Sequence, residues 1–226
     1  MIKFIKVTKQ FPTGIIALSE ASTTIDKDEF VFLIGPSGAG KSTFINLILN
    51  RFNPTSGEIK VDDISITPDF KKNPATLRKK IGIVFQDFKL INTKNVYENI
   101  QLALEIINYP KDKIPLEIAK VLKFVDLENK EKLFPLQLSA GEQQRVAIAR
   151  AIAGGRKIIL ADEPTGNLDP KTSWKIMKIF AKLKGKRTIV FATHNVDIVN
   201  SFQERVIRLE KGKIVSDKKE GSYTTK

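Results

Sequence analysis

The stretch FVFLIGPSGAGKSTFINLILN, residues 30–50, decides the fold of this chain. It opens with the apolar run FVFLI, which is typical of a buried strand, and continues into GPSGAGKST at residues 35–43. That segment fits the pattern of a phosphate-binding loop: a glycine, four residues, a glycine, a lysine and a serine or threonine. Apolar side chains at Phe44, Leu47 and Ile48 then predict a helix over residues 41–52. The sequence therefore predicts a strand, a phosphate loop and a helix in direct succession.

The residue types in this loop suit a triphosphate. Gly38 and Gly40 let backbone N–H groups converge on phosphate oxygens, and the dipole of the following helix attracts the anion. We expect Lys41 to reach the outer phosphates and Ser42 to place its hydroxyl on Mg²⁺. The candidate nucleotide-binding residues are Gly35, Ser37, Gly38, Ala39, Gly40, Lys41, Ser42 and Thr43. A glycine-rich turn that merely caps a helix is the alternative, which the correct flanks on both sides disfavour.

A second apolar run ends in two carboxylates, in KIILADEPTGNLD at residues 157–169. Open parallel sheets bind their ligands at the carboxyl ends of the strands, where Asp162 and Glu163 would lie. We expect Asp162 to hold Mg²⁺ through water and Glu163 to orient and polarise the attacking water. An ordinary turn at a strand end would look the same in isolation, but the phosphate loop upstream favours the catalytic interpretation.

Short apolar runs bounded by turn residues predict a largely parallel sheet with helices between its strands. These runs are residues 30–34, 81–85, 158–161 and 188–192. Residues 171–184 place apolar side chains on one helical stripe and lysines on the other, which predicts a helix packed on the sheet. Helical periodicity predicts an inserted group of helices at 96–106, 116–125 and 140–153. We expect one α/β domain over 1–226, with a nucleotide-binding core at 1–88 and 154–226 and a helical subdomain at 89–153.

The composition excludes several kinds of site. The 226 residues contain no cysteine and one histidine, which excludes disulfides, thiolate metal sites, cysteine nucleophiles and multi-histidine metal sites. No apolar run approaches the roughly 18 residues that cross a bilayer, and the N-terminal MIKFIKVTKQF is typical of a half-buried strand rather than of a signal peptide. The net charge of +13 is concentrated in the last quarter, which suits nucleic acid, anionic lipid, an acidic partner or simply a solvated surface.

Residues 138–142 read LSAGE and are followed by QQRVAIARA. With the phosphate loop and the paired carboxylates, in this order, they make nearly the whole chain resemble the ABC-transporter ATPase family. The resemblance implies a P-loop NTPase fold with a RecA-like core sheet, an N-terminal antiparallel β portion and a helical subdomain insertion. It also implies ATP hydrolysis with Mg²⁺ by an ATP-dependent homodimer, in which Ser139 and Gly141 contact the nucleotide held by the opposite subunit.

The resemblance gives roles to further residues. Gln86, after the strand IGIVF, matches the glutamine that senses Mg²⁺ and the attacking water. Asp169, in the loop 167–169, matches the segment that crosses the dimer interface, and His194 in FATHN matches the switch histidine. A lone histidine is more often structural, but His194 follows an apolar strand, from which it would approach the γ-phosphate. Phe11 matches the aromatic residue that stacks on adenine, unless it is part of the core.

The signature departs from the family pattern at two positions. Ala140 stands where most members have glycine, and Glu142 where many have glutamine. If position 140 required a positive φ, alanine would cost about 1 kcal/mol there and weaken the grip on the partner's nucleotide. Gly141 is kept, so we expect weaker activity at most.

The stretches at 81–100 and 188–200, IGIVFQDFKLINTKNVYENI and TIVFATHNVDIVN, resemble the cell-division ATPases of the family. This implies an integral membrane partner, which in that branch is FtsX, a peripheral place on the cytoplasmic side of the bacterial plasma membrane, and control of cell-wall hydrolases. One alternative is the ATPase of a lipoprotein-releasing or macrolide exporter. Two others are a soluble ABC ATPase that acts on nucleic acid, disfavoured by the single cassette, and an adaptor without turnover, disfavoured by the complete catalytic set.

Apolar residues also follow Gln86 in an otherwise polar stretch. Phe88, Leu90, Ile91 and Tyr97 are typical of a groove that accepts a short helix of a partner. The alternative is that they pack the core of the helical subdomain itself.

Overall fold

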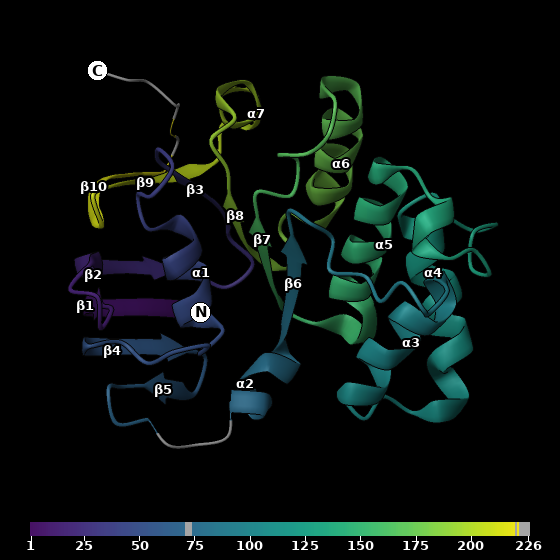
Figure 1. Cartoon of the computed structure of the whole chain (residues 1–226), viewed down its shortest axis with the longest axis horizontal. Coiled ribbons are helices and arrows are strands. Elements are labelled where there is room, and N and C mark those ends of the chain that lie inside the picture. Colours follow the sequence, from purple (N-terminus) through teal and green to yellow (C-terminus); the bar gives the residue numbers. More distant parts are fainter. Residues whose placement is uncertain (71–73, 220, 222–226) are drawn as a thin grey trace. The chain divides into compact units, whose positions relative to one another are not determined.

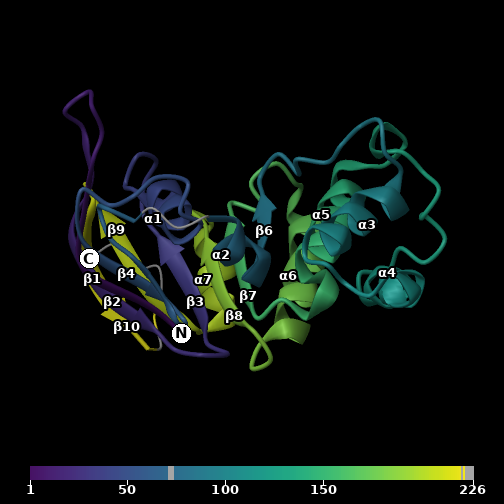
Figure 2. The same cartoon turned by 90° about the horizontal axis from the view of Figure 1, so that it is seen from below.

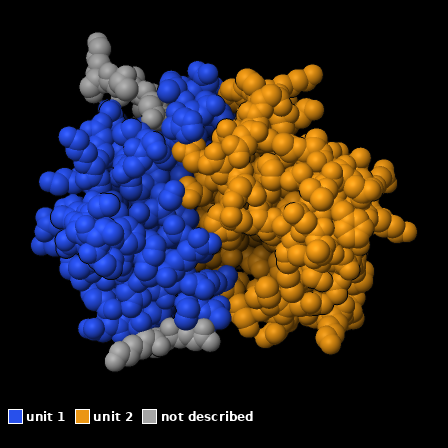
Figure 3. All heavy atoms as spheres, in the orientation of Figure 1, with its two compact units in different colours: residues 1–78, 184–226 blue, residues 79–183 orange. Residues whose placement is uncertain are grey.

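The computed structural model describes residues 1–70, 74–219 and 221 of the chain. The chain divides into two compact units, coloured separately in Figure 3: unit 1 is Met1–Arg78 with Lys184–Lys226, and unit 2 is Lys79–Leu183. This division describes compactness and assigns no function. The predicted nucleotide-binding core at 1–88 and 154–226, and the predicted helical subdomain at 89–153, therefore stay predictions.

Unit 1 begins with an antiparallel sheet of β1 (Ile2–Gln10), β2 (Ile16–Ile25), β4 (Ser56–Val61) and β5 (Ile64–Ile66). The strand order is β2-β1-β4-β5, which the purple and blue arrows of Figure 1 follow. In β1, Ile2, Phe4 and Val7 are buried and Lys3 and Lys6 are exposed, as expected of a strand with one face in water. The antiparallel β portion implied by the family resemblance is therefore present.

The second sheet of unit 1 holds β3 (Phe30–Ile34), β8 (Thr188–Ala192), β9 (Arg205–Glu210) and β10 (Lys213–Lys218), in the order β10-β9-β3-β8. Strand β3 runs parallel to β8 and β9, and every residue of β3 and β8 is buried. This burial on both faces explains the continuous apolar runs that predicted these two strands. Helix α1 (Lys41–Ile48) follows β3, helix α7 (Val196–Phe202) follows β8, and α2 (Pro74–Lys80) leads the chain into unit 2.

The helix after the phosphate loop is shorter than the sequence predicts. It ends at Ile48 rather than at Phe52, because Asn50 adopts a left-handed backbone with φ 46° and its N–H bonds to Leu47 O at 3.0 Å. A left-handed residue cannot continue an α-helix, and asparagine tolerates that conformation better than most residues. Apolar periodicity carries no information about such a stop, so the prediction for residues 49–52 was wrong.

Unit 2 contains the parallel pair β6 (Ile81–Phe85) and β7 (Ile158–Asp162), in which Ile81 lies opposite Ile158 and Phe85 opposite Asp162. Its helices are α3 (Val96–Ile106), α4 (Ile114–Phe124), α5 (Ala140–Ile152) and α6 (Pro170–Leu183), with short 3-10 turns at Lys111–Lys113, Pro135–Gln137 and Ala153–Gly155. Figure 2 shows α5 beside β6. The two elements touch backbone to backbone, since a Cβ at Gly82 would come within 2.0 Å of Ala151 O.

The amphipathic helix expected at 171–184 is α6. It buries the predicted apolar stripe of Ile176, Ile179, Phe180 and Leu183, and it exposes Lys171, Lys175, Lys178 and Lys182. Within residues 1–70 and 74–219, none of the helices combines the length and the apolar character that a membrane span requires.

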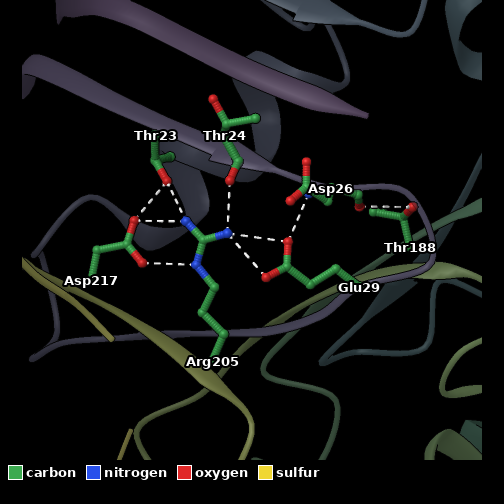
Figure 4. A network of polar contacts seen from close by, with 7 residues as sticks. All are labelled: Thr23, Thr24, Asp26, Glu29, Thr188, Arg205 and Asp217. Atoms are coloured by element: carbon green, nitrogen blue, oxygen red, sulfur yellow. Dashed lines mark hydrogen bonds and ion pairs between the residues drawn. The ribbon is translucent and has the colours of Figure 1, made fainter. Parts of the chain in front are cut away.

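A polar network joins the two sheets of unit 1 (Figure 4). Arg205 on β9 donates to Thr24 O on β2 at 2.7 Å, to Glu29 Oε1 at 3.0 Å, and to both oxygens of Asp217 on β10 at 2.8 Å. Thr23 Oγ1 accepts from Arg205 at 3.0 Å and donates to Asp217 at 2.8 Å. Burial would raise the pKa of Asp217, but hydrogen bonds from Arg205 and Thr23 outweigh it and hold that pKa below its ordinary value.

Replacing Asp217 with asparagine should lower the free energy of unfolding by about 1–2 kcal/mol at neutral pH, because Arg205 loses a charged partner in a partly exposed site. A carboxyl with a depressed pKa stabilises the fold above the pKa of the unfolded chain, and this contribution is lost as the pH falls through the folded-state pKa. The difference in unfolding midpoint between wild type and Asp217→Asn should therefore be constant above about pH 5 and shrink as the pH falls from there to about pH 2. A constant difference would contradict this account, and Glu128→Gln, at an exposed carboxylate, is the control.

Candidate nucleotide-binding and catalytic site

The predicted phosphate loop of unit 1 is packed tightly on neighbouring backbone. Gly35 has φ +150° and Gly40 has φ +107°. A Cβ at Gly35 would lie 2.3 Å from Leu209 O, and one at Gly40 would lie 2.5 Å from Ala17 O. Because no side chain fits at either position, the loop requires glycine there on steric grounds as well as for its backbone conformation.

Lys41 already points into this loop. Its side chain is buried, and Nζ donates to Gly35 O at 2.8 Å and to Pro36 O at 3.2 Å. Helix α1 begins directly after Gly40, which offers no side-chain cap, and its first turn holds no acidic residue. The loop therefore presents an ammonium group and a helix N-terminus without a competing side-chain anion on α1, which is the electrostatic setting of a phosphate site.

The other residues predicted to bind phosphate differ in their exposure. Ser37, Gly38 and Ser42 are exposed, Thr43 is half-buried, and Ala39 is buried where its carbonyl accepts from Gly212 N at 3.1 Å. The hydroxyl of Ser42 is therefore placed at the surface, at the start of α1. The predicted residues from Gly35 to Gly40 form the connection between β3 and α1, and Lys41, Ser42 and Thr43 form the first turn of α1.

His194 leaves the strand next to the one that carries the phosphate loop. Strands β3 and β8 are parallel neighbours with Leu33 opposite Ala192, and Thr193 N donates to Leu33 O at 3.1 Å. The imidazole of His194 is exposed. The next residue, Asn195, caps α7 by accepting from Ile198 N at 3.1 Å, which fixes the backbone that follows His194.

Phe11 lies outside the buried core. It begins the connection between β1 and β2, which extends away from the sheets of unit 1 in Figure 2. Its half-buried ring meets Phe52 edge to face at 5.4 Å, and Lys9 Nζ lies 5.5 Å from the ring centroid. The alternative that Phe11 is an ordinary core residue is therefore wrong, while its contact with adenine stays a prediction.

In unit 2, Asp162 and Glu163 lie at the end of β7. Asp162 is paired with Phe85 in the last register pair of β6 and β7. Glu163 and Gln86 are the residues that follow this pair in the two strands. Both carboxylates are half-buried, and Glu163 has a left-handed backbone with φ 50°. The backbone turns at once, with Gly166 N donating to Glu163 O at 3.0 Å.

The side chain of Gln86 is held against this turn. Gln86 Nε2 donates to Asn167 Oδ1 at 3.0 Å, and Asn167 Nδ2 donates back to Gln86 O at 3.3 Å. A Cβ at Gly166 would lie 2.9 Å from Gln86 Nε2, so the amide packs directly over the glycine. Residues 86 and 163–167, distant in sequence, are thus one cluster within unit 2.

The predicted signature residues lie at the N-terminus of α5. Ser139 caps the helix by accepting from Glu142 N at 3.4 Å. In return, its N–H and its hydroxyl donate to Glu142 Oε2, at 2.9 and 2.8 Å. These two hydrogen bonds lower the pKa of Glu142. Ala140 has no positive φ, so the penalty considered for alanine at this position does not arise. Gly141 is the position without room, because a Cβ there would lie 2.5 Å from Thr172 Cγ2.

Asp169 has a local partner in the same unit. Its carboxylate accepts from Thr172 N at 3.0 Å at the start of α6, and hydrogen bonding to Thr172 lowers the pKa of Asp169. Thr172 therefore connects two predicted site residues, since its N–H is held by Asp169 and its methyl group packs against Gly141.

Two residues of α5 that contact this cluster were not singled out from the sequence. Arg150 donates to Lys89 O at 2.6 Å and to Phe88 O at 2.8 Å, where the backbone is left-handed. Burial, with a smaller contribution from Arg156, lowers the pKa of Arg150 to about 10. Gln144 is fully buried and donates to backbone carbonyls at the ends of both strands. The available signal was a polar residue on the buried stripe that Gly141, Ile148 and Ala151 share.

With this geometry in place, the chain was compared with known proteins. The family model described as "ABC transporter" matches residues 18–166. The chain belongs to the ABC transporter ATPase family. This cassette is an ATPase by family, and it has the P-loop NTPase fold.

Curated relatives and solved structures match the cassette over nearly its whole length. The "Cell division ATP-binding protein FtsE" of Bacillus subtilis (strain 168) is 46% identical over 224 residues, which are 99% of this chain and 98% of the relative. FtsE of Mycobacterium tuberculosis (strain ATCC 25618 / H37Rv) is 45% identical over 225 residues, with the same coverage. A solved "Dimeric Structure of MJ0796, a Bacterial ABC Transporter Cassette" has a TM-score of 0.86 and 40% identity, covering 99% of this chain and 100% of that chain.

The cassette should not tolerate a methyl group at position 141. Gly141→Ala forces the new Cβ into Thr172, which should lower the free energy of unfolding by about 1–3 kcal/mol. Thr172→Ser removes the methyl group that is hit and keeps the backbone donor to Asp169. The double variant should therefore regain most of the lost stability in thermal unfolding, and additive losses in it would show that the clash is not the cause.

Proposed function

We propose that this ATPase is the nucleotide-hydrolysing subunit of a membrane complex of the FtsE type, which works with an FtsX-like membrane protein in bacterial cell division to regulate cell-wall hydrolases. The observation that carries this proposal is the 43–46% identity to relatives named FtsE, over 97–98% of their length. A methionine-import ATPase, MetN of Carboxydothermus hydrogenoformans (strain ATCC BAA-161 / DSM 6008 / Z-2901), is 39% identical but is matched over only 65% of its length. We place the cassette on the cytoplasmic side of the plasma membrane, peripherally.

ATP is held by the phosphate loop, with Lys41 on the outer phosphates and Phe11 on the adenine. The Mg²⁺ ion would be bound by Ser42, Gln86 and, through water, Asp162. In the described part of the chain no group of three or more histidine, aspartate or glutamate side chains could hold a metal ion alone. This donor set fits an ion that takes part of its ligands from the nucleotide, as Mg²⁺ commonly does. The ion would neutralise charge that develops on the phosphates.

Glu163 polarises and orients the water that attacks the γ-phosphate. Gln86, held by Asn167 at 3.0 Å, senses the ion and that water, and His194 donates to the γ-phosphate. The carboxylate of Glu163 accepts a proton from water as the new P–O bond forms, and ADP leaves.

Two copies of the cassette form an ATP-dependent homodimer. Ser139 and Gly141 stand at the start of α5, a helix N-terminus that suits a phosphate, and Ser139 is exposed. In this arrangement they contact the nucleotide of the second copy, and Asp169 lies at the interface. Support comes from the solved relative described as a dimeric cassette and from another described as a "post-hydrolysis state" bound to ADP and Pi, which is 38% identical with a TM-score of 0.85 and covers 99% of this chain and 100% of that chain.

Glu163→Gln should bind ATP yet hydrolyse it at least about a hundredfold more slowly, because the attacking water loses its base while the phosphate loop is intact. Lys41→Ala should show the opposite pattern and lose ATP affinity. Phosphate release and equilibrium ATP binding measured on both variants separate the two roles. Near-normal turnover by Glu163→Gln would contradict the proposed mechanism.

The segment after Gln86 is the proposed contact with the membrane partner. Ile91 is 37% exposed, and Phe88, Leu90 and Tyr97 are half-buried. The backbone under these side chains is fixed: Arg150 holds it at Phe88, and Asn99 exchanges hydrogen bonds with both Ile91 N and Ile91 O, at 2.9 and 3.1 Å. Anchors on a rigid backbone lose little entropy on binding, which suits a docking site.

Replacing Phe88 and Leu90 together with serine should abolish co-purification with the FtsX-like protein while ATP binding stays close to wild type. Ile106→Ser with Leu116→Ser is the matched control, because it removes two exposed apolar side chains elsewhere in unit 2. Normal co-purification of the Phe88 and Leu90 variant, or its unfolding, would show that the contact lies elsewhere.

A further inference from the structure

Gln144 is a polar residue in a fully buried position. It lies on α5 with 0% of its surface exposed. Its Nε2 donates to Pro164 O at 2.6 Å and, more weakly, to Phe85 O at 3.4 Å. Both partners are carbonyl oxygens, so only the NH₂ end of the amide can face them. The orientation of the side chain is thereby fixed by chemistry.

The amide is a poor choice for stability alone. Its Oε1 atom is buried and has no hydrogen-bond partner among the described residues, which typically costs about 1–3 kcal/mol. A methionine of similar length would fill the space and remove that cost, in exchange for the hydrogen bonds to Pro164 O and Phe85 O. The unsatisfied oxygen therefore suggests that the two donated hydrogen bonds serve something other than core packing.

The two carbonyl groups stand beside the proposed catalytic residues. Phe85 is the last residue of β6 and precedes Gln86, and Pro164 directly follows Glu163. One NH₂ group thus bridges the exits of both strands, one residue away from each reactive side chain. The main-chain pairing of β6 with β7 ends at Phe85 opposite Asp162, so Gln144 continues the link where the strand pairing stops.

The backbone at this point is strained and needs support. Glu163 has φ 50°, a conformation that costs a residue with a side chain roughly 1–3 kcal/mol and persists only where the surroundings impose it. The hydrogen bond at 2.6 Å to the next carbonyl, Pro164 O, is one such constraint. The second constraint is the turn from Gly166 N to Glu163 O.

We infer that Gln144 is a positioning residue for ATP hydrolysis: its amide fixes the chain on either side of Gln86 and Glu163, so that the glutamine and the carboxylate meet the same water. This inference rests on the roles proposed for Gln86 and Glu163. Gln144 is fully buried, and it acts on the reaction only through the main-chain carbonyl groups that it holds. Loss of the Gln144 amide would change the positions of Gln86 and Glu163. Displacement of a catalytic group by about 1 Å commonly costs up to a hundredfold in rate.

Gln144→Met tests this directly, because it keeps the length of the side chain and removes the donor. The expected result is a kcat reduced about 10- to 100-fold with KM for ATP within about twofold of wild type. The thermal midpoint should stay near wild type, since an unsatisfied oxygen is removed together with the donor. The control is Glu117→Ala, which removes another buried side chain of unit 2 that accepts from Gly154 N at 2.9 Å, far from these strand ends in sequence. It should lower stability and leave kcat unchanged.

The variant Gln144→Glu gives a pH dependence of kcat that a change in packing alone would not produce. A neutral carboxyl has one O–H that can donate to Pro164 O, whereas a carboxylate would face two carbonyl oxygens and repel them. Burial and those oxygens raise the pKa of a carboxyl at this position. The kcat of Gln144→Glu, as a fraction of wild type, should therefore rise as the pH falls from about 8 to about 6, while the fraction for Gln144→Met stays flat.

The outcomes separate this inference from the function on which it rests. Near-normal turnover by Glu163→Gln would overturn the proposed mechanism and the inference together. If Glu163→Gln loses turnover but Gln144→Met keeps wild-type kcat, or loses rate only in proportion to its folded fraction, the inference alone is wrong. It is upheld if kcat falls with KM and stability retained, if the pH profile of Gln144→Glu rises toward acid, and if Gln144→Met slows the Glu163→Gln variant by less than about twofold.

Discussion

The arrangement of unit 2 depends on the close approach of helix α5 to strand β6. A single methyl group at Gly82 would collide with Ala151 O at 2.0 Å, so the helix can lie on the strand only because that residue has no side chain. From this position α5 reaches the main chain next to Gln86 and Glu163. Its N-terminus carries Ser139 and Gly141, its middle carries Gln144, and its last turn carries Arg150, which holds the backbone after Gln86. One packing contact thus supports the N-terminus of α5, the ends of β6 and β7, and the segment proposed to bind the membrane partner.

The phosphate loop of unit 1 also depends on glycines that let segments of backbone pack closely. Gly35 and Gly40 lie against backbone carbonyls of Leu209 and Ala17, which belong to two different sheets. The Arg205 network joins those sheets at a separate place, between β2, β9 and β10. The shape of the loop is therefore set by its contacts with the surrounding backbone and by the hydrogen bonds from Lys41 to Gly35 O and Pro36 O. Such preorganisation is what electrostatic stabilisation of a phosphoryl transfer requires.

Local sequence patterns predicted the strands and the phosphate loop. Contacts between segments distant in sequence could not be predicted from such patterns. The apolar runs at 30–34, 81–85 and 188–192 became strands with the predicted bounds, because burial on both faces leaves a continuous hydrophobic signature. The motif of the phosphate loop, a property of a few adjacent residues, was equally readable. Gln144 and Arg150 were missed, since donation from a side chain to a distant carbonyl depends on how α5 packs. The end of α1 at Ile48 was missed because one left-handed residue, Asn50, decides it.

In the proposed homodimer, hydrolysis needs the phosphate loop of one copy and the signature of the other. Lys41→Ala disables the first and Ser139→Arg blocks the second, so neither variant alone should hydrolyse ATP. A mixture of the two contains pairs in which an intact loop faces an intact signature. We therefore predict that phosphate release reappears on mixing and rises with the concentration of the second variant. A mixture that stays as inactive as its components, although each variant is folded, would contradict the account.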